Sequence, residues 1–510
     1  MDHRPQLILT RRGTRVPHPY PRAPCERSCE SWTSANTMSE GEGGRERGRE
    51  GERDQTPPGA VAGPDPRTTR GSGLIPVMNL AERAGLHDLA AAHVRIAGSA
   101  GSSAQVKVAA LVAGMVAGAD SIDDMDLLRH GGMGRVLTAG RAPSTLGTFL
   151  RSCTFGHVRQ LDAVASRLLV NLAARAPLLV GADQVTYVDI DDTIKATYGH
   201  KKQGTGYGYS GVKGLNALLA VVSTPLSAPV IAATRRRRGA TNCAKGAARL
   251  VADALVTAAK AGASGQVTVR ADSAYYNHDV IAAARTGGAR FSITARMDPA
   301  LTRAITQIPD DAWVGIKYPH AIYDEDEHRW VSDAEVAEIA FTAFTSRKKA
   351  EHIGARLIVR RVKRLNPATV PTGQGELFST WRHHAVFTDS AESMLAAEAS
   401  HRDHAIIEKV IAELKNGPLA HLPSGQMNAN AAWLILAAIS FNLTRAAGTL
   451  ASRFHARATT ATIRTQLIAV PARIARSARR LRLHLPERWP WEHAWQAMFT
   501  AAGGPPAPAT

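Results

Sequence analysis

An acidic segment in the middle of the chain has the residue types needed to bind a divalent cation. Residues 186–192 read TYVDIDD, a β-branched and aromatic run that predicts a strand ending in acids. Asp is a poor strand former, and a buried carboxylate is costly unless it is paired or bound to a cation. Strand alternation puts Asp192 on the side of Val188 and Ile190. We predict Asp192 as an oxygen ligand for Mg²⁺ or Mn²⁺, with Asp189 and Asp191 as the next candidates; a turn-capping Asp is the alternative.

A second acid, Asp272, comes directly after another strand-like run at residues 267–271. In a fold that makes the strands of Asp192 and Asp272 neighbours, the two acids would face each other at one end of a sheet. A turn Asp at a strand end is common and is the alternative interpretation. Because the two acids recur at the two positions that this fold brings together, we predict Asp272 as the second metal ligand.

The third acid lies on a predicted helix, HRDHAIIEKVIAELK, which begins at His401. Its apolar residues recur with the period of a helix that buries one face. His401, His404, Glu408 and Lys415 are spaced by three, four and seven residues and form a second stripe beside that face. We predict that this stripe completes the metal site and grips a phosphodiester; a solvated polar face is the alternative.

Three other motifs match signatures of other kinds of site. The segment GYGYSG, which begins at Gly206, matches a dinucleotide fingerprint, but it neither follows a strand directly nor opens a helix. The His401, His404 and Glu408 set lacks the H-E-x-x-H order of a zinc hydrolase and has no apparent third ligand. A run of four arginines follows a strand, and we predict a loop facing DNA phosphate rather than a localisation signal: Arg235, Arg236, Arg237 and Arg238.

An α/β core is predicted to carry these acids. From residue 181 to 297 the chain reads as three consecutive strands, a helix, a strand, a helix and a strand. The strands are expected at residues 186–191, 215–222, 230–234, 267–271 and 291–294, and the helices at 244–261 and 279–285. Strand alternating with helix favours an α/β sheet, and this order is that of RNase H. We therefore expect an α/β fold with an RNase H-like catalytic core.

Five further segments surround or interrupt this core. Residues 1–74 are rich in Pro, Gly, Arg, Glu and Ser and are predicted to be disordered. Residues 75–180 predict a helical domain, which docks on DNA or serves packing alone. Residues 298–390 hold strand-like runs and predict a β-rich insertion domain. Helices resume over residues 391–447 to complete the core, and residues 448–510 form a basic C-terminal tail.

The charge balance favours a polyanionic partner. The chain has 62 Lys plus Arg against 44 Asp plus Glu, a formal net charge of +18. Between Arg445 and Arg488 there are ten Arg and a single acid, Glu487. Such a segment is typical of a nucleic-acid arm, because each neutralised phosphate releases a counterion. Clustered arginines, the first three at helical spacing, are predicted to line one DNA-facing surface: Arg473, Arg476, Arg479, Arg480 and Arg482.

The cysteines and the hydropathy pattern indicate a cytosolic protein. Cys25, Cys29, Cys153 and Cys243 are too few and too scattered for a disulfide framework, and no second ligand pair follows the first two at zinc spacing. No uninterrupted apolar stretch reaches the roughly 18 residues of a membrane span, and no secretory pattern opens the chain. We expect free thiols and no membrane partner.

In two of its acidic segments the sequence resembles the DDE transposases of bacterial insertion sequences. The group concerned has a β-rich insertion between the second Asp and the Glu. The first match is IDDT around Asp192, where the family has its catalytic Asp followed by Thr, and the second is RADSAYY around Asp272. The ending, with RLRLHLP and WPW, also resembles the family's. The resemblance covers residues 78–497.

The third match is the family's Tyr-x2-Arg-x3-Glu-x6-Lys helix. Its Glu and Lys correspond to Glu408 and Lys415, and the spacing matches throughout. His401 and His404 stand where the family has Tyr and Arg, and Arg402 lies close by. The resemblance implies that the His residues, Arg402 and Lys415 contact DNA.

The resemblance also implies an activity. Asp192, Asp272 and Glu408 would hold two Mg²⁺ or Mn²⁺ ions, one activating the nucleophile and the other stabilising the leaving oxygen. Water would free a 3′-OH at the end of the element, and that 3′-OH would then attack target DNA. The implied partners are double-stranded DNA, as terminal inverted repeats and as target, and a second copy of the chain in the DNA complex. The implied location is the bacterial cytoplasm, on the nucleoid when DNA is bound.

Two alternatives remain at the level of the sequence. One is an RNase H-like nuclease that cuts without joining; the basic tail and the N-terminal helices favour a transposase over it. The other is an inactive, transposase-derived DNA-binding protein, against which the presence of all three acids argues. Metal-dependent nicking of DNA that carries the element ends would separate these functions.

Overall fold

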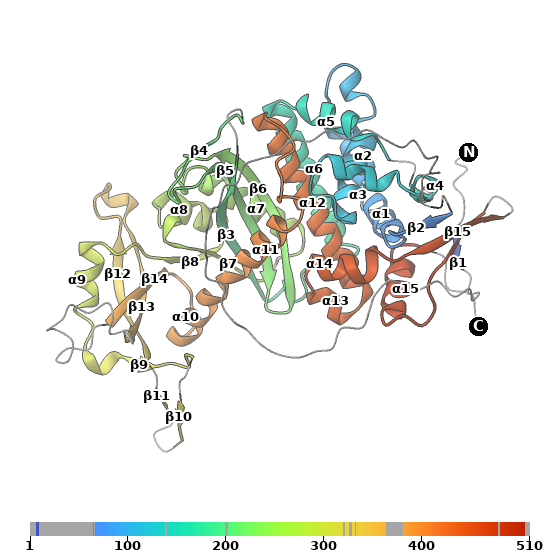
Figure 1. Cartoon of the computed structure of the whole chain (residues 1–510). Coiled ribbons are helices and arrows are strands. Elements are labelled where there is room, and N and C mark those ends of the chain that lie inside the picture. The colour runs from blue at the N-terminus through green and yellow to red at the C-terminus, as the bar shows by residue number, and fades with distance from the viewer. Residues whose placement is uncertain are drawn as a thin grey trace, which may run out of the picture.

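The structure is a computed structural model, and it describes most of the chain from residue 67 to residue 504 (Figure 1). It also describes Asp65 and the short strand β1 (Leu7–Leu9). Within residues 67–504 the following lie outside the described part: 138–139, 199–201, 320–321, 326–328, 332, 364–380 and 478–479. The predictions made for Cys25, Cys29 and Arg479 therefore fall outside the described residues.

The first part of the described chain is helical. Its six α-helices are α1 (Leu74–Arg83), α2 (Leu86–His93), α3 (Ala104–Ala117), α4 (Met133–Val136), α5 (Pro143–Arg151) and α6 (Phe155–Ala173). Helix α6 begins at a capping box, in which the Thr154 side chain accepts from the His157 N–H and the His157 ring accepts from the Thr154 N–H.

The N-terminal boundary of the fold lies earlier than predicted. Strand β2 (Thr68–Thr69) pairs with a C-terminal strand, the Ser72 hydroxyl donates to the Val470 carbonyl at 2.8 Å, and Leu74 is fully buried. The prediction of disorder up to residue 74 is therefore wrong for residues 67–74. Sequence composition missed them because only a few apolar side chains anchor this segment.

A ten-stranded mixed sheet forms the centre of the molecule. Its strands lie in the order β4-β5-β3-β7-β8-β14-β13-β12-β9, with β6 paired to β5. The predicted core supplies β3 (Val185–Ala196), β4 (Gly206–Tyr207), β5 (Lys213–Thr224), β6 (Ser227–Arg238), β7 (Gln266–Ala271) and β8 (Arg290–Thr294). The first and fourth predicted strands, β3 and β7, are parallel neighbours, as expected, with Ile190 opposite Ala271.

The predicted insertion extends this same sheet instead of forming a sheet of its own. Its strands are β9 (Val314–Gly315), β12 (Ala334–Ala343), β13 (Ile353–Lys363) and β14 (Trp381–Thr388), with a small hairpin β10 (Ile322–Asp324) and β11 (Arg329–Val331). Strand β14 runs antiparallel to β8, with Phe387 opposite Ile293. Helix α9 (Pro299–Ile305) lies beside β12. The strands were predictable from their β-branched residues, whereas their continuity with the core sheet was not.

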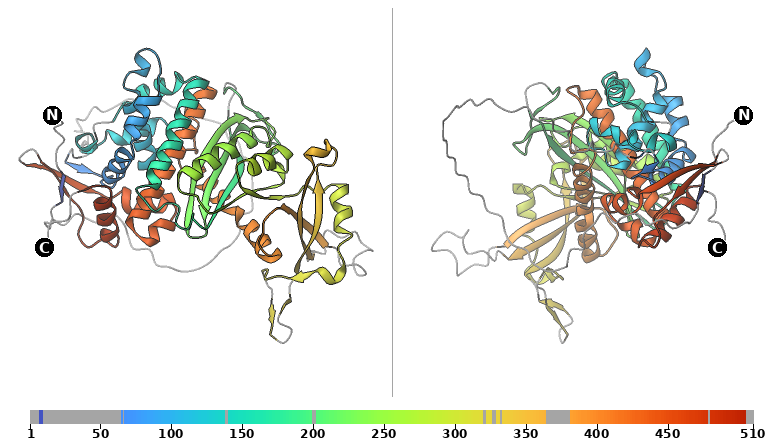
Figure 2. Two further views of the ribbon diagram at one scale, coloured as in Figure 1. Left: turned by 180° about the vertical axis from the view of Figure 1, so that it is seen from behind. Right: turned by 45° about the vertical axis from the view of Figure 1, so that its right-hand side comes forward.

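Helices cover both faces of the core part of the sheet (Figures 1 and 2). Helices α7 (Ala247–Lys260) and α8 (His278–Thr286) pack on one face. Helices α10 (Met394–Arg402), α11 (Ile406–Lys415) and α12 (Met427–Ala451) follow the insertion, and α11 and α12 pack on the other face. Helix α12 also contacts α3 and α6, so it joins the sheet to the helical domain.

By length and composition, helix α12 is long and apolar enough to cross a membrane. This corrects the expectation, based on uninterrupted apolar stretches of the sequence, that no segment reaches that length. Of its most apolar window, 89% is buried inside the protein. Single polar residues such as Asn430 and Asn442 interrupt the apolar run, and both are buried. Asn442 exchanges hydrogen bonds with the backbone of Ile231 at 2.8 Å. These contacts are those of the core helix of a folded domain.

The C-terminal tail is a folded part of the protein. It consists of α13 (Arg453–Arg457), α14 (Thr460–Ile463), strands β15 (Ala472–Ser477) and β16 (Arg480–His484), and α15 (Glu492–Ala501). Strands β15 and β16 form an antiparallel hairpin in a sheet of order β1-β16-β15-β2. The hairpin projects from the edge of the molecule beside the helical domain (Figures 1 and 2). The helical spacing expected for its arginines is therefore wrong.

Candidate functional site

The two faces of β3 carry different acids. Asp189 and Asp191 lie on one face, and Asp192 lies on the other because strand side chains alternate. The face of Asp189 looks toward α10 and α11, since the His404 ring, between those helices, lies 3.9 Å from the Asp189 carboxylate. The face of Asp192 looks toward the segment that leads into α7, where its partner Arg237 donates to the Lys245 carbonyl.

Asp191 lies beside Asp272. The last paired residues of β3 and β7 are Ile190 and Ala271, so Asp191 and Asp272 are the next residues of two adjacent parallel strands and share a face. Burial, together with the nearby carboxylates of Asp272, Asp192 and Glu408, raises the pKa of Asp191 to about 7. Burial also raises the pKa of Asp272, whose side chain accepts from the Ala274 N–H at 3.0 Å.

Asp192 has a different environment from the one predicted. Its side chain is buried and forms an ion pair with Arg237, which also donates to the Asn216 side chain at 2.8 Å. Its carboxylate is near enough to Asp272 to raise the pKa of that acid. The Asp192 carboxylate nevertheless has a dedicated cationic partner, whereas Asp191 has no ion-pair partner among the described residues. The register and this ion pair favour Asp191 over Asp192 as the acid that acts with Asp272.

Glu408 approaches the two aspartates from α11. The apolar stripe of this helix is buried as predicted, and Glu408 is exposed on its first turn. The carboxylate of Glu408 raises the pKa of Asp191, which shows that the two lie within electrostatic range. The predicted single helix is divided, however: α10 ends at Arg402, a 3-10 turn spans Asp403–Ala405, and α11 begins at Ile406.

The two histidines of the predicted phosphate-gripping stripe differ in burial. His401 is buried, and its ring nitrogens lie 3.0 Å from the Ser292 hydroxyl and 2.9 Å from the Thr294 hydroxyl. Burial lowers the pKa of His401 to about 3, so the ring is neutral and cannot reach DNA. The prediction of a DNA contact by His401 is therefore wrong. His404 is half-buried near Asp189, Asp272 and Glu408, and burial lowers its pKa.

A buried ion pair between Asp189 and Arg270, on strands β3 and β7, lies two residues before Asp191 and Asp272. Arg270 is 1% exposed and grips Asp189 with two hydrogen bonds, Nε to Oδ1 at 2.6 Å and Nη2 to Oδ2 at 2.8 Å. Its third nitrogen, Nη1, donates to the Ser400 carbonyl at 2.5 Å, and its guanidinium lies 3.9 Å from the centre of the Tyr187 ring. Arg270 thus joins β3, β7 and the last turn of α10, and it was missed because no sequence pattern marks such a pair.

Free cations lie at the far end of α11. Lys415 is exposed and makes no ion pair with any residue that the structure describes. Burial lowers the pKa of Lys195, at the end of β3, and nearby Lys415 lowers it further. Two adjacent ammonium groups are suited to an anion such as a phosphodiester. Arg402 is partly exposed, but Glu398 already binds it at 2.9 Å.

The arginine run 235–238 is not a loop. It forms the end of strand β6, where Arg235 pairs with Asp162 and Asp253, and Arg237 pairs with Asp192. The guanidinium nitrogens of Arg236 are buried without a hydrogen-bond partner in the described part of the chain, for which the structure offers no explanation. Only Arg238 is exposed. The predicted DNA-facing loop is therefore wrong, because the run lies in a strand and because Arg235 and Arg237 bind acids that are distant in sequence.

Tyr209 is an exposed aromatic residue above the acids that the sequence analysis did not select. Its side chain is 75% exposed, and it lies in the segment between β4 and β5. Partial desolvation raises the pKa of this exposed tyrosine to about 12, and the carboxylates of Asp192, Asp191 and Asp272 contribute to this rise. The signal was present in the sequence as GYGYSG, which was weighed only as a nucleotide fingerprint.

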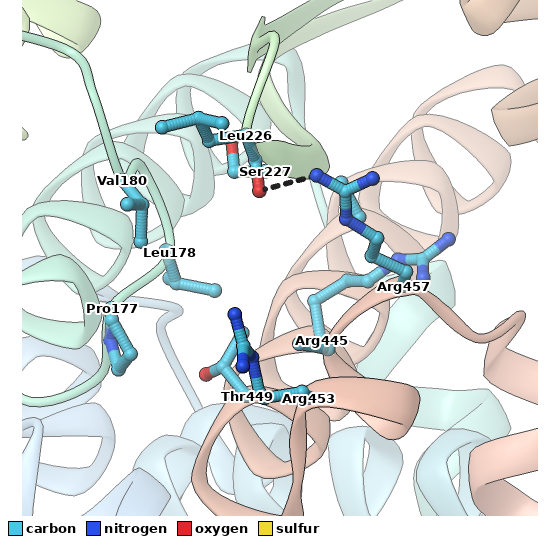
Figure 3. Close-up of a pocket in the computed structure, with 11 residues that line it drawn as sticks. Pro177, Leu178, Val180, Leu226, Ser227, Arg445, Thr449, Arg453 and Arg457 are labelled. Carbon is cyan, nitrogen blue, oxygen red and sulfur yellow. Dashed lines mark hydrogen bonds between the residues drawn. The ribbon is translucent and has the colours of Figure 1, made fainter.

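A cavity of about 530 Å³ lies beside the turn between β5 and β6 (Figure 3). The turn between β5 and β6 forms one wall with Leu226, and the ends of α12 and α13 form the other with Arg445 and Arg457. Arg457 closes part of it by donating to the Leu226 carbonyl at 3.2 Å. The cavity contains none of the acids and is separate from the candidate site.

The protein is of the α/β class, and its acidic site lies at one end of the sheet. Two adjacent parallel strands each carry a carboxylate there, and a facing helix carries a third. The family model described as transposase DDE domain, group 1, matches residues 67–502. The chain therefore belongs to the DDE transposase family. Members of this family generally use divalent metal ions.

Comparisons with individual proteins add little to the family assignment. Among solved structures, the chain is similar to a piggyBac transposase in a synaptic complex with hairpin DNA, with 10% identity, a TM-score of 0.35 and 76% of each chain covered. Such a TM-score is too low to define the positions of site residues. The comparison with curated proteins gave no match.

Proposed function

We propose that this protein cleaves the ends of a mobile DNA element and joins them to target DNA, using an RNase H-like core. The observation that carries the proposal is the placement of Asp191 and Asp272 on adjacent parallel strands, facing the helix that carries Glu408. The family assignment supports the reaction class. We further propose that the protein acts in the bacterial cytoplasm on nucleoid DNA, as a homodimer.

The acids fit divalent cations by their chemistry. Asp191, Asp272 and Glu408 are oxygen donors, which Mg²⁺ and Mn²⁺ prefer. Asp191 and Asp272 have raised pKa values, and repulsion from neighbouring carboxylates contributes to both; a cation would relieve that repulsion. In this structure no three His, Cys, Asp or Glu side chains in the described part of the chain are close enough together to hold one ion.

Bound divalent cations would supply activation of the attacking oxygen and stabilisation of the leaving oxygen. The chain's own residues position the reacting groups. Arg270 holds β3, β7 and the end of α10 together, which fixes the distance between the aspartates and the segment leading to Glu408. Lys195 and Lys415 would bind the phosphodiester that enters the site, because they are adjacent and Lys415 has no acidic partner among the described residues.

Joining distinguishes this proposal from a nuclease that cuts alone. The test incubates the purified protein and Mg²⁺ with a duplex that carries the inverted repeats flanking its gene and with a plasmid target. We expect nicks at the repeat ends, followed by joining of the repeat to the plasmid. Cleavage without joined product would support the RNase H-like nuclease. Binding with neither reaction would support the inactive DNA-binding protein.

Crowding of the acids should reduce the stability of the metal-free protein. The pKa of Asp191 is raised to about 7, so the folded state holds a proton that the unfolded state releases near pH 4. This stabilising contribution is fully present below pH 4 and is lost as the pH rises through about 7. We expect metal-free Asp191→Asn to melt at a higher temperature than wild type at pH 8, and the difference to shrink toward pH 5.

Thermal melts in a chelator at several pH values measure this effect. Added Mg²⁺ should raise the Tm of wild type but not that of the variant, since binding to the folded state alone stabilises it. Asp183→Asn, on the segment before β3, serves as a charge-matched control. An equal Tm for Asp191→Asn and wild type at every pH would show that Asp191 is not strained by its neighbours.

A further inference from the structure

The sheet formed by β15 and β16 has two unlike faces. On one face Ala472, Ile474 and Leu483 are buried against Ile75 of α1, which anchors the base of the hairpin to the helical domain. Strand alternation places Arg473 on the opposite face. The register pairs Arg473 with His484 across the hairpin. One face therefore packs on the helical domain, and the other carries Arg473 and His484.

The outward face gathers cations without acids. Arg473 is exposed, and Arg482, two residues from His484 on the same face, is partly exposed. Burial lowers the pKa of His484, and the guanidinium groups of Arg473 and Arg482 lower it further, so the three side chains lie close together. Diagonal neighbours on a sheet face are about 7–8 Å apart. Residues 472–484 contain no acid at all.

These arginines differ from the others that the sequence analysis selected. Arg235 and Arg237 are held by acids inside the fold. Arg473 and Arg482 make no hydrogen bond or ion pair with any described residue, and the Nε of Arg482 is buried without a partner. Like charges held together without a counter-charge destabilise the protein alone, so their arrangement points to an external anion.

We infer that the outward face of the β15–β16 hairpin binds the phosphate backbone of duplex DNA, with Arg473 and Arg482 as the contacting residues. The inference rests on the proposed function, which supplies DNA as the partner. Guanidinium groups bind phosphate with two parallel hydrogen bonds. The hairpin that carries these arginines projects from the edge of the molecule. Such contacts position DNA and carry no sequence information.

The arginines that helical spacing grouped on one surface do not all lie on this face of the hairpin. Arg476 stands opposite Leu481 and shares the face of Ile474, so it points away from Arg473. Arg480 is paired with Ser477 in the backbone register, while Arg479 lies outside the described residues. Arg476 is therefore the natural internal comparison for Arg473, with the same charge, strand and exposure.

The test measures affinity for a random-sequence duplex against salt concentration, in a chelator so that no cleavage occurs. We expect Arg473→Ala/Arg482→Ala to lower the slope of log K against log salt by about 1.8, or about 0.9 for each lost phosphate contact. At about 0.1 M salt the affinity should fall roughly eightfold per contact. Arg473→Lys/Arg482→Lys keeps the charges and should retain most of the slope.

Two controls make the result decisive. Arg476→Ala, on the other face, should change the slope little, and Arg249→Ala/Arg303→Ala removes two exposed charges from α7 and α9, away from the hairpin. An unchanged slope in the Arg473/Arg482 variant, or an equal loss in the α7/α9 variant, would overturn the inference. Cleavage activity with an unchanged slope refutes the hairpin surface alone. Normal binding without cleavage or joining refutes the proposed function alone.

Discussion

Replacing Asp191, Asp272 or Glu408 by its amide is expected to abolish metal-dependent cleavage of end-bearing DNA. Each substitution removes a carboxylate oxygen that would hold a divalent cation, and cations in such sites provide several kcal/mol of transition-state stabilisation. Because about 1.4 kcal/mol corresponds to a tenfold rate, we expect a loss of about a thousandfold or more. DNA binding in a chelator should stay near the wild-type level, since no proposed DNA contact is changed.

Asp192→Asn is the matched control for this prediction, because it removes the same charge from the next residue of β3. The side chain of Asp192 faces away from α11 and is bound by Arg237, so its amide should lose stability more than activity. Cleavage rates are measured for all four variants at equal folded fraction, which melting curves establish. Activity close to wild type in Asp191→Asn, with an inactive but folded Asp192→Asn, would return the site to the assignment made from the sequence.

The sequence predicts the strand that carries Asp191 and Asp192, but not which of the two acids faces the site. The strand, its acids and its neighbour β7 were all predictable from β-branched residues and from the order of elements. The choice of face was not, because both faces of β3 are buried and acids occur on each. That choice depends on which helix covers which face, and α11 lies more than 200 residues further along the chain.

The predictions for His401 and for the C-terminal arginines were wrong for a related reason. His401 has the spacing of a DNA-binding residue, but Ser292 and Thr294 on β8 hold its ring in the interior. Arg473 and Arg476 are three residues apart, which suits one face of a helix and opposite faces of a strand. Spacing predicts a shared face only when the type of element is known.

The buried Arg270–Asp189 pair yields the largest effect expected on stability. Asp189 has no exposed surface, and Arg270 is its bidentate partner. Arg270→Met would leave an uncompensated carboxylate, and losing one partner of a buried pair costs about 3–5 kcal/mol. The Ser400 carbonyl would also lose its donor, which loosens the end of α10. We therefore expect a large fall in the free energy of unfolding, measured by denaturant titration.

The pH dependence of that loss identifies its cause. Without Arg270, burial raises the pKa of Asp189 with no guanidinium to oppose it, so the folded variant would take up a proton. A raised pKa in the folded state gives stability that is lost as the pH rises, so Arg270→Met should be less destabilised at pH 5 than at pH 8. Asp189→Leu/Arg270→Met removes both charges and should recover much of the stability, because apolar side chains replace buried pairs well. If the double variant regains stability but still needs far more Mg²⁺ for half-maximal cleavage, the pair positions Glu408 as well as stabilising the sheet. If Mg²⁺ dependence returns with stability, Arg270 has no positioning role beyond the fold.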